Sequence, residues 1–218
     1  MFKPLAASIV FGLVVAGTSA LTDANDRPIA PSSRPVVSRD VEGKKGAIFD
    51  DVNLGTRVSF VMDASGSMIN KMATLKDQLK KTINGMSREQ SFNVIFFQDN
   101  KCDMVSRNLL PTTAGNKIRA DVFLDGVTTT GTTDPIPGIE AAFRQKPDTI
   151  YLLTDGDFPD NDAVLKKIRE LNKDKKVRVY TIAFEGTADN DTAFKDLLKT
   201  IAKENGGEYK HVEEAKVK

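Results

Sequence analysis

Three residues with oxygen-bearing side chains follow a short apolar run in the stretch FVMDASGSM, residues 60–68. They are Asp63, Ser65 and Ser67, and a single residue separates each from the next. Carboxylate and hydroxyl groups in this pattern serve three kinds of chemistry: a serine nucleophile, a helix cap, or a site for a hard metal ion. The rest of the chain has to distinguish between them.

Two further stretches carry the same kinds of oxygen. YLLTDGD ends another apolar run with Thr154 and Asp155, and GVTTTGTTDPIPG (126–138) is crowded with threonine and glycine. Carboxylates and hydroxyls suit Mg²⁺, Mn²⁺ or Ca²⁺, whereas a single histidine and a single cysteine argue against zinc. Because two acids and a few hydroxyls do not saturate Mg²⁺, such a site leaves room for a carboxylate from another molecule.

The elements that must position these residues can be read from the apolar pattern. Four nearly continuous apolar runs, rich in β-branched and aromatic residues, predict buried strands at 57–62, 92–97, 149–154 and 177–184. Amphipathic spacing between them predicts helices over 68–83, over 164–171 after a cap at Asn161 or Asp162, and over 194–201 after Asp191.

This alternation predicts an α/β fold with a doubly wound, mostly parallel central sheet that is flanked by helices on both faces. Ligands of such sheets bind at the carboxyl ends of the strands. Asp63 and Asp155 each follow a predicted strand, so we expect both at that edge. The stretch 126–138 joins two helices, and we expect it at the same edge.

Three motifs together resemble a known family. D-x-S-x-S at Asp63, Ser65 and Ser67, G-T-T-D at 131–134 and T-D-G at 154–156 are similar, in order and spacing, to the metal-ion-dependent adhesion site of von Willebrand factor type A (vWA) domains. The resemblance covers about residues 56 to 213.

The resemblance implies five metal ligands: Asp63, Ser65, Ser67, Thr133 and Asp155. The two serines would bind Mg²⁺ directly, with Mn²⁺ or Ca²⁺ as alternatives, and the two acids would act directly or through water. The family usually has a second glycine where this chain has Thr132. We assign Thr133 because it immediately precedes Asp134, with Thr132 as the alternative; a threonine at that position costs backbone freedom if it requires a positive φ.

Other functions find less support in the sequence. A serine hydrolase needs a base near the serine, but the only histidine is His211 and no G-x-S-x-G motif is present. The acidic run 155–162 does not match a calcium loop, because Asp160 and Lys166 stand where glycine and glutamate are required. A formal charge of +1, with 31 basic and 30 acidic residues, argues against a nucleic-acid surface. We therefore expect a binding protein and no enzyme.

The chain divides into three expected segments. Residues 1–20 carry an apolar run and small residues that predict a secretory signal cleaved after Ala20, so that the protein is secreted or periplasmic; an uncleaved anchor is the alternative. Residues 21–55, rich in proline, serine and charge, predict a flexible arm, and 56–218 the vWA domain. Cys102 has no second cysteine in the chain to pair with, so it is either buried or pairs with another chain.

Two hypotheses about function follow. In the first, the domain binds a divalent cation and uses it to bind a protein partner that offers Asp or Glu. In the second, the ion only stabilises the loops of a structural or assembly module, or the domain is an accessory subunit of a larger metal-dependent complex.

Overall fold

The computed structural model describes residues 48–49, 54–156, 158–185, 192–213 and 217. Within them the strands are β1 (Arg57–Asp63), β2 (Ser91–Gln98), β3 (Lys101–Met104), β4 (Leu110–Pro111), β5 (Thr149–Thr154), β6 (Arg178–Glu185) and β7 (Tyr209–Glu213). The helices are the 3-10 helix η1 (Gly66–Asn70) and the α-helices α1 (Met72–Gly85), α2 (Ala114–Gly126), α3 (Ile136–Arg144), α4 (Asn161–Leu171) and α5 (Thr192–Glu204).

The strands form one sheet in the order β3-β2-β1-β5-β6-β7, and β4 also pairs with β2. The pairs β1–β2, β1–β5, β5–β6 and β6–β7 are parallel, whereas β3 and β4 run antiparallel to β2. The strand order changes direction at β1, which lies between β2 and β5. This is the topological switch point of a doubly wound sheet, where the loops after neighbouring strands diverge and leave space for a ligand.

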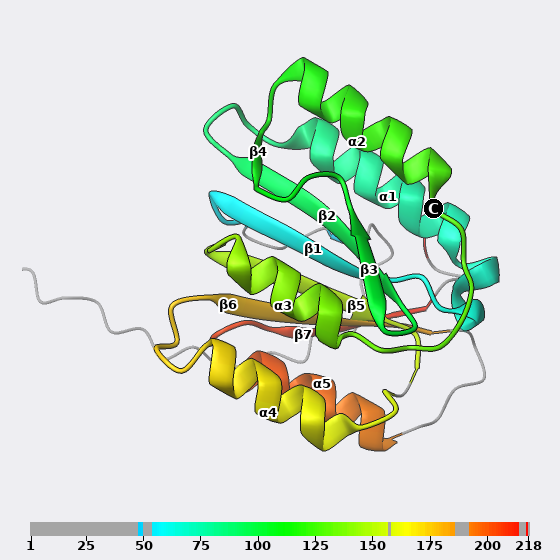
Figure 1. Cartoon of the computed structure of the whole chain (residues 1–218), viewed down its shortest axis with the longest axis vertical. Coiled ribbons are helices and arrows are strands. Elements are labelled where there is room, and N and C mark those ends of the chain that lie inside the picture. The colour runs from blue at the N-terminus through cyan, green and yellow to red at the C-terminus, as the bar shows by residue number, and fades with distance from the viewer. Residues whose placement is uncertain (1–47, 50–53, 157, 186–191, 214–216, 218) are drawn as a thin grey trace, which may run out of the picture. The chain divides into compact units, whose positions relative to one another are not determined.

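Helices cover both faces of the sheet (Figure 1). On one face, Leu75 and Leu79 of α1 and Leu124 of α2 pack against strand residues such as Phe60. The other face is covered by α3, α4 and α5, which pack against strand residues that include Val61. Because neighbouring residues of a strand point to opposite faces, nearly continuous apolar strands are what this two-sided burial requires. The predicted fold class is confirmed.

Several boundaries differ from the predictions. Met68 belongs to η1, and α1 begins only at Met72, so the expected helix is broken after the first loop. The cap of α4 is Asp160, whose side chain accepts a hydrogen bond from the Ala163 N–H at 2.8 Å, in place of the predicted Asn161 or Asp162. A carboxylate is a good cap because it satisfies a free N–H group of the first turn.

The expected signal (1–20) and most of the expected arm (21–55) lie outside the described residues, as does Asp191. Two described residues of the arm are part of the core: Ile48 and Phe49 are buried, and the Phe49 ring packs edge-on against Phe60 and Tyr151. The packed domain therefore includes residues ahead of the expected start at 56. In the part of the chain that the structure describes, no helix has the length and apolar character needed to span a membrane.

Candidate metal centre

The first loop leaves β1 at Asp63 and turns immediately into η1. The Ser65 N–H donates a hydrogen bond to Asp63 Oδ1 at 2.7 Å, and the Met68 N–H donates to the Ser65 carbonyl at 3.1 Å. These bonds curl the chain so that Ser65 is buried beside the carboxylate while Ser67 is exposed. The alternating residues of the D-x-S-x-S motif thus place a buried carboxylate, Asp63, and an exposed hydroxyl, Ser67, in the same loop.

Asp63 is completely buried, and two hydrogen bonds do not offset the loss of water around its charge. Besides Ser65, the Thr154 hydroxyl donates to Asp63 Oδ2 at 2.7 Å. Burial nevertheless raises the pKa of Asp63 to about 6; the hydrogen bonds lower it, and the nearby Asp155 adds to the rise. The surrounding protein groups leave this carboxylate short of positive charge.

Asp155, at the end of β5, joins the same site. Its Oδ1 accepts a hydrogen bond from the Ser67 hydroxyl at 2.7 Å, and the Ser67 and Ser65 hydroxyl oxygens are 3.0 Å apart. Its Oδ2 accepts from the Lys71 ammonium group at 2.8 Å. The loop after β1 and the loop after β5 are thus connected by hydrogen bonds. We expected this because β1 and β5 are parallel neighbours.

The third loop, between α2 and α3, is hydrogen-bonded to the first. The Thr130 N–H donates to the Ala64 carbonyl at 3.0 Å, and the Gly66 N–H donates to the Gly131 carbonyl at 3.1 Å. Gly131 has a φ of +71°, and a Cβ atom there would lie 2.1 Å from Asp99 Oδ1. Glycine is required at this position both for its conformation and for the space.

Asp99 fixes the orientation of Thr132. The Thr132 N–H donates to Asp99 Oδ1 at 2.8 Å, its hydroxyl lies 3.3 Å from the same oxygen, and the Asp99 N–H donates to the Thr132 carbonyl at 2.8 Å. Among the described residues, Thr132 is not one of those with a positive φ, so the concern about its backbone does not arise. Thr133 is half-buried, and its hydroxyl makes no hydrogen bond within the described part of the chain.

The structure therefore joins Asp63, Ser65, Ser67 and Asp155 through hydrogen bonds, and places the loop of Thr133 beside them. In the described ranges, no group of three or more histidine, cysteine, aspartate or glutamate side chains could hold a metal ion. Any ion bound at this edge of the sheet would need serine and threonine hydroxyls as ligands in addition to the two carboxylates. That donor set fits a hard cation and does not suit zinc or copper.

Three features of this site were not predicted from the sequence: Lys71, Thr154 as a partner of Asp63, and Asp99. Thr154 belongs to the T-D-G motif, and its contact with Asp63 could have been found from the pairing of β1 with β5. Asp99 occupies a turn between β2 and β3 with a φ of +51°, a conformation in which aspartate is enriched. Lys71 had no sequence signal, because a lysine before a helix usually extends into solvent.

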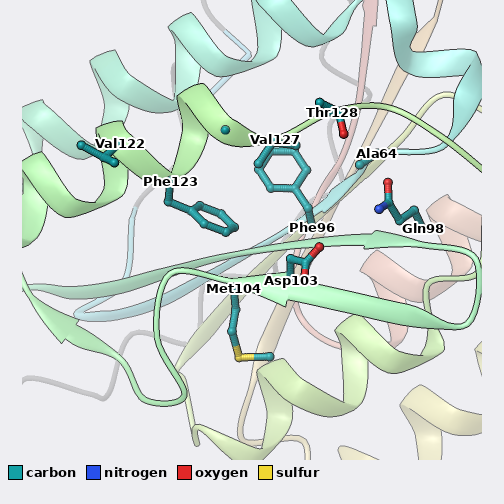
Figure 2. Close-up of a pocket in the computed structure, with 10 residues that line it drawn as sticks. Ala64, Phe96, Gln98, Asp103, Met104, Val122, Phe123, Val127 and Thr128 are labelled. Atoms are coloured by element: carbon teal, nitrogen blue, oxygen red, sulfur yellow. The ribbon is translucent and has the colours of Figure 1, made fainter.

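A pocket lies next to the first loop, between α2 and the β2–β3 hairpin (Figure 2). Its volume is about 360 Å³, and it is lined by Ala64, Phe96, Gln98, Asp103, Met104, Val122, Phe123, Gly126, Val127 and Thr128. The Gln98 amide, oriented so that its NH₂ group donates, lies 3.2 Å from the Ala64 carbonyl and 3.3 Å from that of Thr128. Gln98 thus connects the end of β2 to the first and third loops.

Comparison with known proteins agrees with this architecture. The chain is similar to a von Willebrand factor type A protein from Catenulispora acidiphila, with a TM-score of 0.56 and 18% identity over 71% of this chain and 38% of that one. It is also similar to the SpRpn10 VWA domain, with a TM-score of 0.51 and 14% identity over 72% of this chain and 86% of that one. At these identities the likeness shows the fold alone.

The matched part of this chain spans less than half the length of the Catenulispora protein. The sequence itself matches the von Willebrand factor type A domain family over residues 56–211. This match includes all three loops of the site, together with β1 and β5, which lead into two of them. The chain belongs to the von Willebrand factor type A domain family.

Proposed function

We propose that this protein binds a divalent cation, Mg²⁺ with Mn²⁺ or Ca²⁺ as alternatives, through Asp63, Ser65, Ser67, Thr133 and Asp155. The observation that carries the proposal is the position of Asp63, a fully buried carboxylate in one hydrogen-bonded network with Ser65, Ser67 and Asp155. Burial raises its pKa to about 6. A cation beside it would supply the missing positive charge.

The hydrogen bonds leave the serines suitable as ligands. Ser67 donates its proton to Asp155, and Ser65 can then donate its own proton to Ser67. One lone pair of the Ser67 oxygen therefore remains available on the exposed side of the loop. Thr133 contributes the third hydroxyl, because Thr132 is held by Asp99.

We further propose that the ion binds a protein partner through an Asp or Glu side chain. The protein offers two carboxylates and three hydroxyls, which leaves coordination positions for an external oxygen. The surface around Ser67 also suits contact with a protein, because Ile69 is 68% exposed and Asn70 is exposed beside it. An exported location, from the predicted signal at 1–20, would bring this rim into contact with partners outside the cytoplasm.

A binding role is favoured over catalysis by the position of the only histidine. His211 lies on the edge strand β7, which is separated from β1 by β5 and β6. At about 4.8 Å per strand, this places its backbone roughly 14 Å from β1, beyond the reach of a proton transfer to Ser65 or Ser67.

The test uses Mn²⁺ as the probe and measures water-proton relaxation. Mn²⁺ bound to the protein should enhance relaxation, acetate should reduce the enhancement by displacing bound water, and uncharged acetamide should not. Ser67→Ala should abolish the enhancement and Thr133→Ala should weaken it, whereas Thr132→Ala serves as the matched control. Absence of Mn²⁺ binding would contradict the proposal. Binding without an acetate effect would restrict the ion to stabilising the loops.

A further inference from the structure

Lys71 is the residue immediately before α1, and its side chain turns inward to the site. Its ammonium group lies 2.8 Å from Asp155 Oδ2, with the side chain of Lys71 10% exposed and that of Asp155 fully buried. Lysine normally keeps its ammonium group in water, because burial removes hydration that one partner only partly replaces. A buried lysine at the rim of a cation site therefore needs an explanation.

The local helix does not provide one. The amino end of a helix carries partial positive charge and favours acidic side chains. Neither η1 nor α1 has an acidic residue in its first turn, and Lys71 precedes α1 as its cap without a side-chain cap bond. Lys71 thus stands where the helix disfavours a cation, and Asp155 is the group that holds it there.

The other ion pair of α1 provides a comparison. Lys80 contacts Asp125 at 2.6 Å, but these side chains are 28% and 68% exposed, so water screens the pair. The Lys71–Asp155 pair is shielded from water, so its charges are screened less than those of Lys80 and Asp125. Asp63, whose own charge is not compensated, lies within the same network of hydrogen bonds.

We propose that the Lys71 ammonium is a tethered cation that competes with the divalent ion for Asp155. The inference rests on the proposed function and deepens it, because it assigns a residue that sets the affinity of the site. Asp155 Oδ1 accepts from Ser67 and Oδ2 from Lys71, so a divalent ion at this carboxylate would lie close to the Lys71 ammonium group and share its negative charge. Repulsion between the two cations lowers ion affinity and makes ion release easy.

The test measures the Kd for Mg²⁺ and for Mn²⁺ by isothermal titration calorimetry. It compares the wild type with four variants. Lys71→Met removes the charge, Lys71→Gln removes the charge but keeps a donor for Asp155, and Lys71→Arg keeps the charge. Lys80→Met is the matched control, since it removes the same charge from the exposed part of α1. We expect Kd to fall about tenfold or more in the Met and Gln variants and to change less than about threefold in the other two.

The outcomes separate this inference from the proposed function. If the wild type binds ion and both neutral variants bind it equally or more weakly, Lys71 does not compete and the inference is wrong. The same holds if neither neutral variant folds with ion present, since Lys71 would then be a structural cation that the ion does not replace. If only the neutral variants bind, competition is upheld and metal binding by the native chain is contradicted. Absence of binding in every protein overturns both.

Discussion

Two aspartates at opposite ends of neighbouring strands show how differently one side chain can be used. Asp63 ends β1 at the carboxyl edge of the sheet, and Asp148 directly precedes β5 at the amino edge. Asp148 Oδ2 accepts hydrogen bonds from the Thr56 N–H at 2.9 Å, the Thr56 hydroxyl at 2.6 Å and the Arg57 N–H at 3.0 Å. Asp63 accepts from the Ser65 N–H and the Thr154 hydroxyl.

The pKa values of these two carboxyls shift in opposite directions. Burial raises the pKa of Asp63 to about 6, and its hydrogen bonds do not compensate. At Asp148 burial also acts to raise the pKa, but the hydrogen bonds from Thr56, Thr149 and Arg57 outweigh it, and the pKa is lowered. The hydrogen bonds to Oδ2 favour the charged form of Asp148 and tie chain segments together. Both oxygens of Asp63 also accept hydrogen bonds, but burial still disfavours its charge, which is typical of a carboxylate in a functional site.

The largest expected effect concerns pH, with a chelator present to keep ion away. The native state retains the Asp63 proton up to about pH 6, whereas the unfolded state loses it near 3.8, so stability falls as pH rises between these values. The fall due to Asp63 should be about 3 kcal/mol. Asp63→Asn should remove it, since the amide accepts from Ser65 and donates to Thr154.

This prediction is checked by denaturant unfolding of both proteins between pH 4 and pH 8. Contributions from groups that both proteins share cancel in the difference between their free energies of unfolding. If the difference in free energy of unfolding between the wild type and Asp63→Asn does not vary with pH, the charge of Asp63 is compensated without an ion. The contribution of Asp148 to the free energy of unfolding should depend on pH with the opposite sign. Its lowered pKa adds stability that is lost as pH falls below 3.8.

Replacement of Asp148 should affect stability without affecting the ion site. Asp148→Ala removes the acceptor of three hydrogen bonds at the amino edge, and we expect a loss of about 2 kcal/mol in the free energy of unfolding. The stabilisation produced by Mg²⁺ should be the same as in the wild type. A reduced response to Mg²⁺ would show that the two edges are coupled, and the contrast between the two aspartates would no longer hold.

The smallest effect is expected from Thr154. Thr154→Val removes the hydroxyl that donates to Asp63 Oδ2 while keeping the shape of the side chain, and should cost about 1 kcal/mol at neutral pH in chelator. It should also raise the pKa of Asp63 further, because a lowering contribution is lost. Thr154→Ser keeps the hydroxyl and serves as the control. Equal pH profiles for the two variants would exclude this hydrogen bond as a determinant.

The parts of the fold that depend on burial were predictable from sequence. Strands β1, β2, β5 and β6 are apolar on both faces, and this pattern identified them to within a few residues. Strand β3 was missed because it is a short edge strand, KCDM, whose exposed positions carry polar residues and give no apolar run. The division between η1 and α1 was missed because the spacing of Met68 and Met72 suits one continuous helix.

The site likewise contains residues that the sequence predicted and residues that it did not. Residues attached to strand ends, such as Asp63 and Asp155, could be brought together from strand order and the family motifs. Lys71 could not, because its role depends on a rotamer that brings the ammonium group to Asp155 from a different loop. The hydrogen bonds that hold Thr132 were not predictable either, since they come from Asp99 in the β2–β3 turn.

The most direct test of the central claim is thermal unfolding of the wild type and Asp63→Asn at pH 7, first with chelator and then with saturating Mg²⁺. An ion at a hundred times its Kd stabilises a protein by about 2.7 kcal/mol. We predict a rise in Tm of roughly 5 to 10 °C in the wild type and none in the variant. An equal Tm with chelator and with Mg²⁺ in the wild type, or an equal rise in both proteins, would contradict a cation site at Asp63.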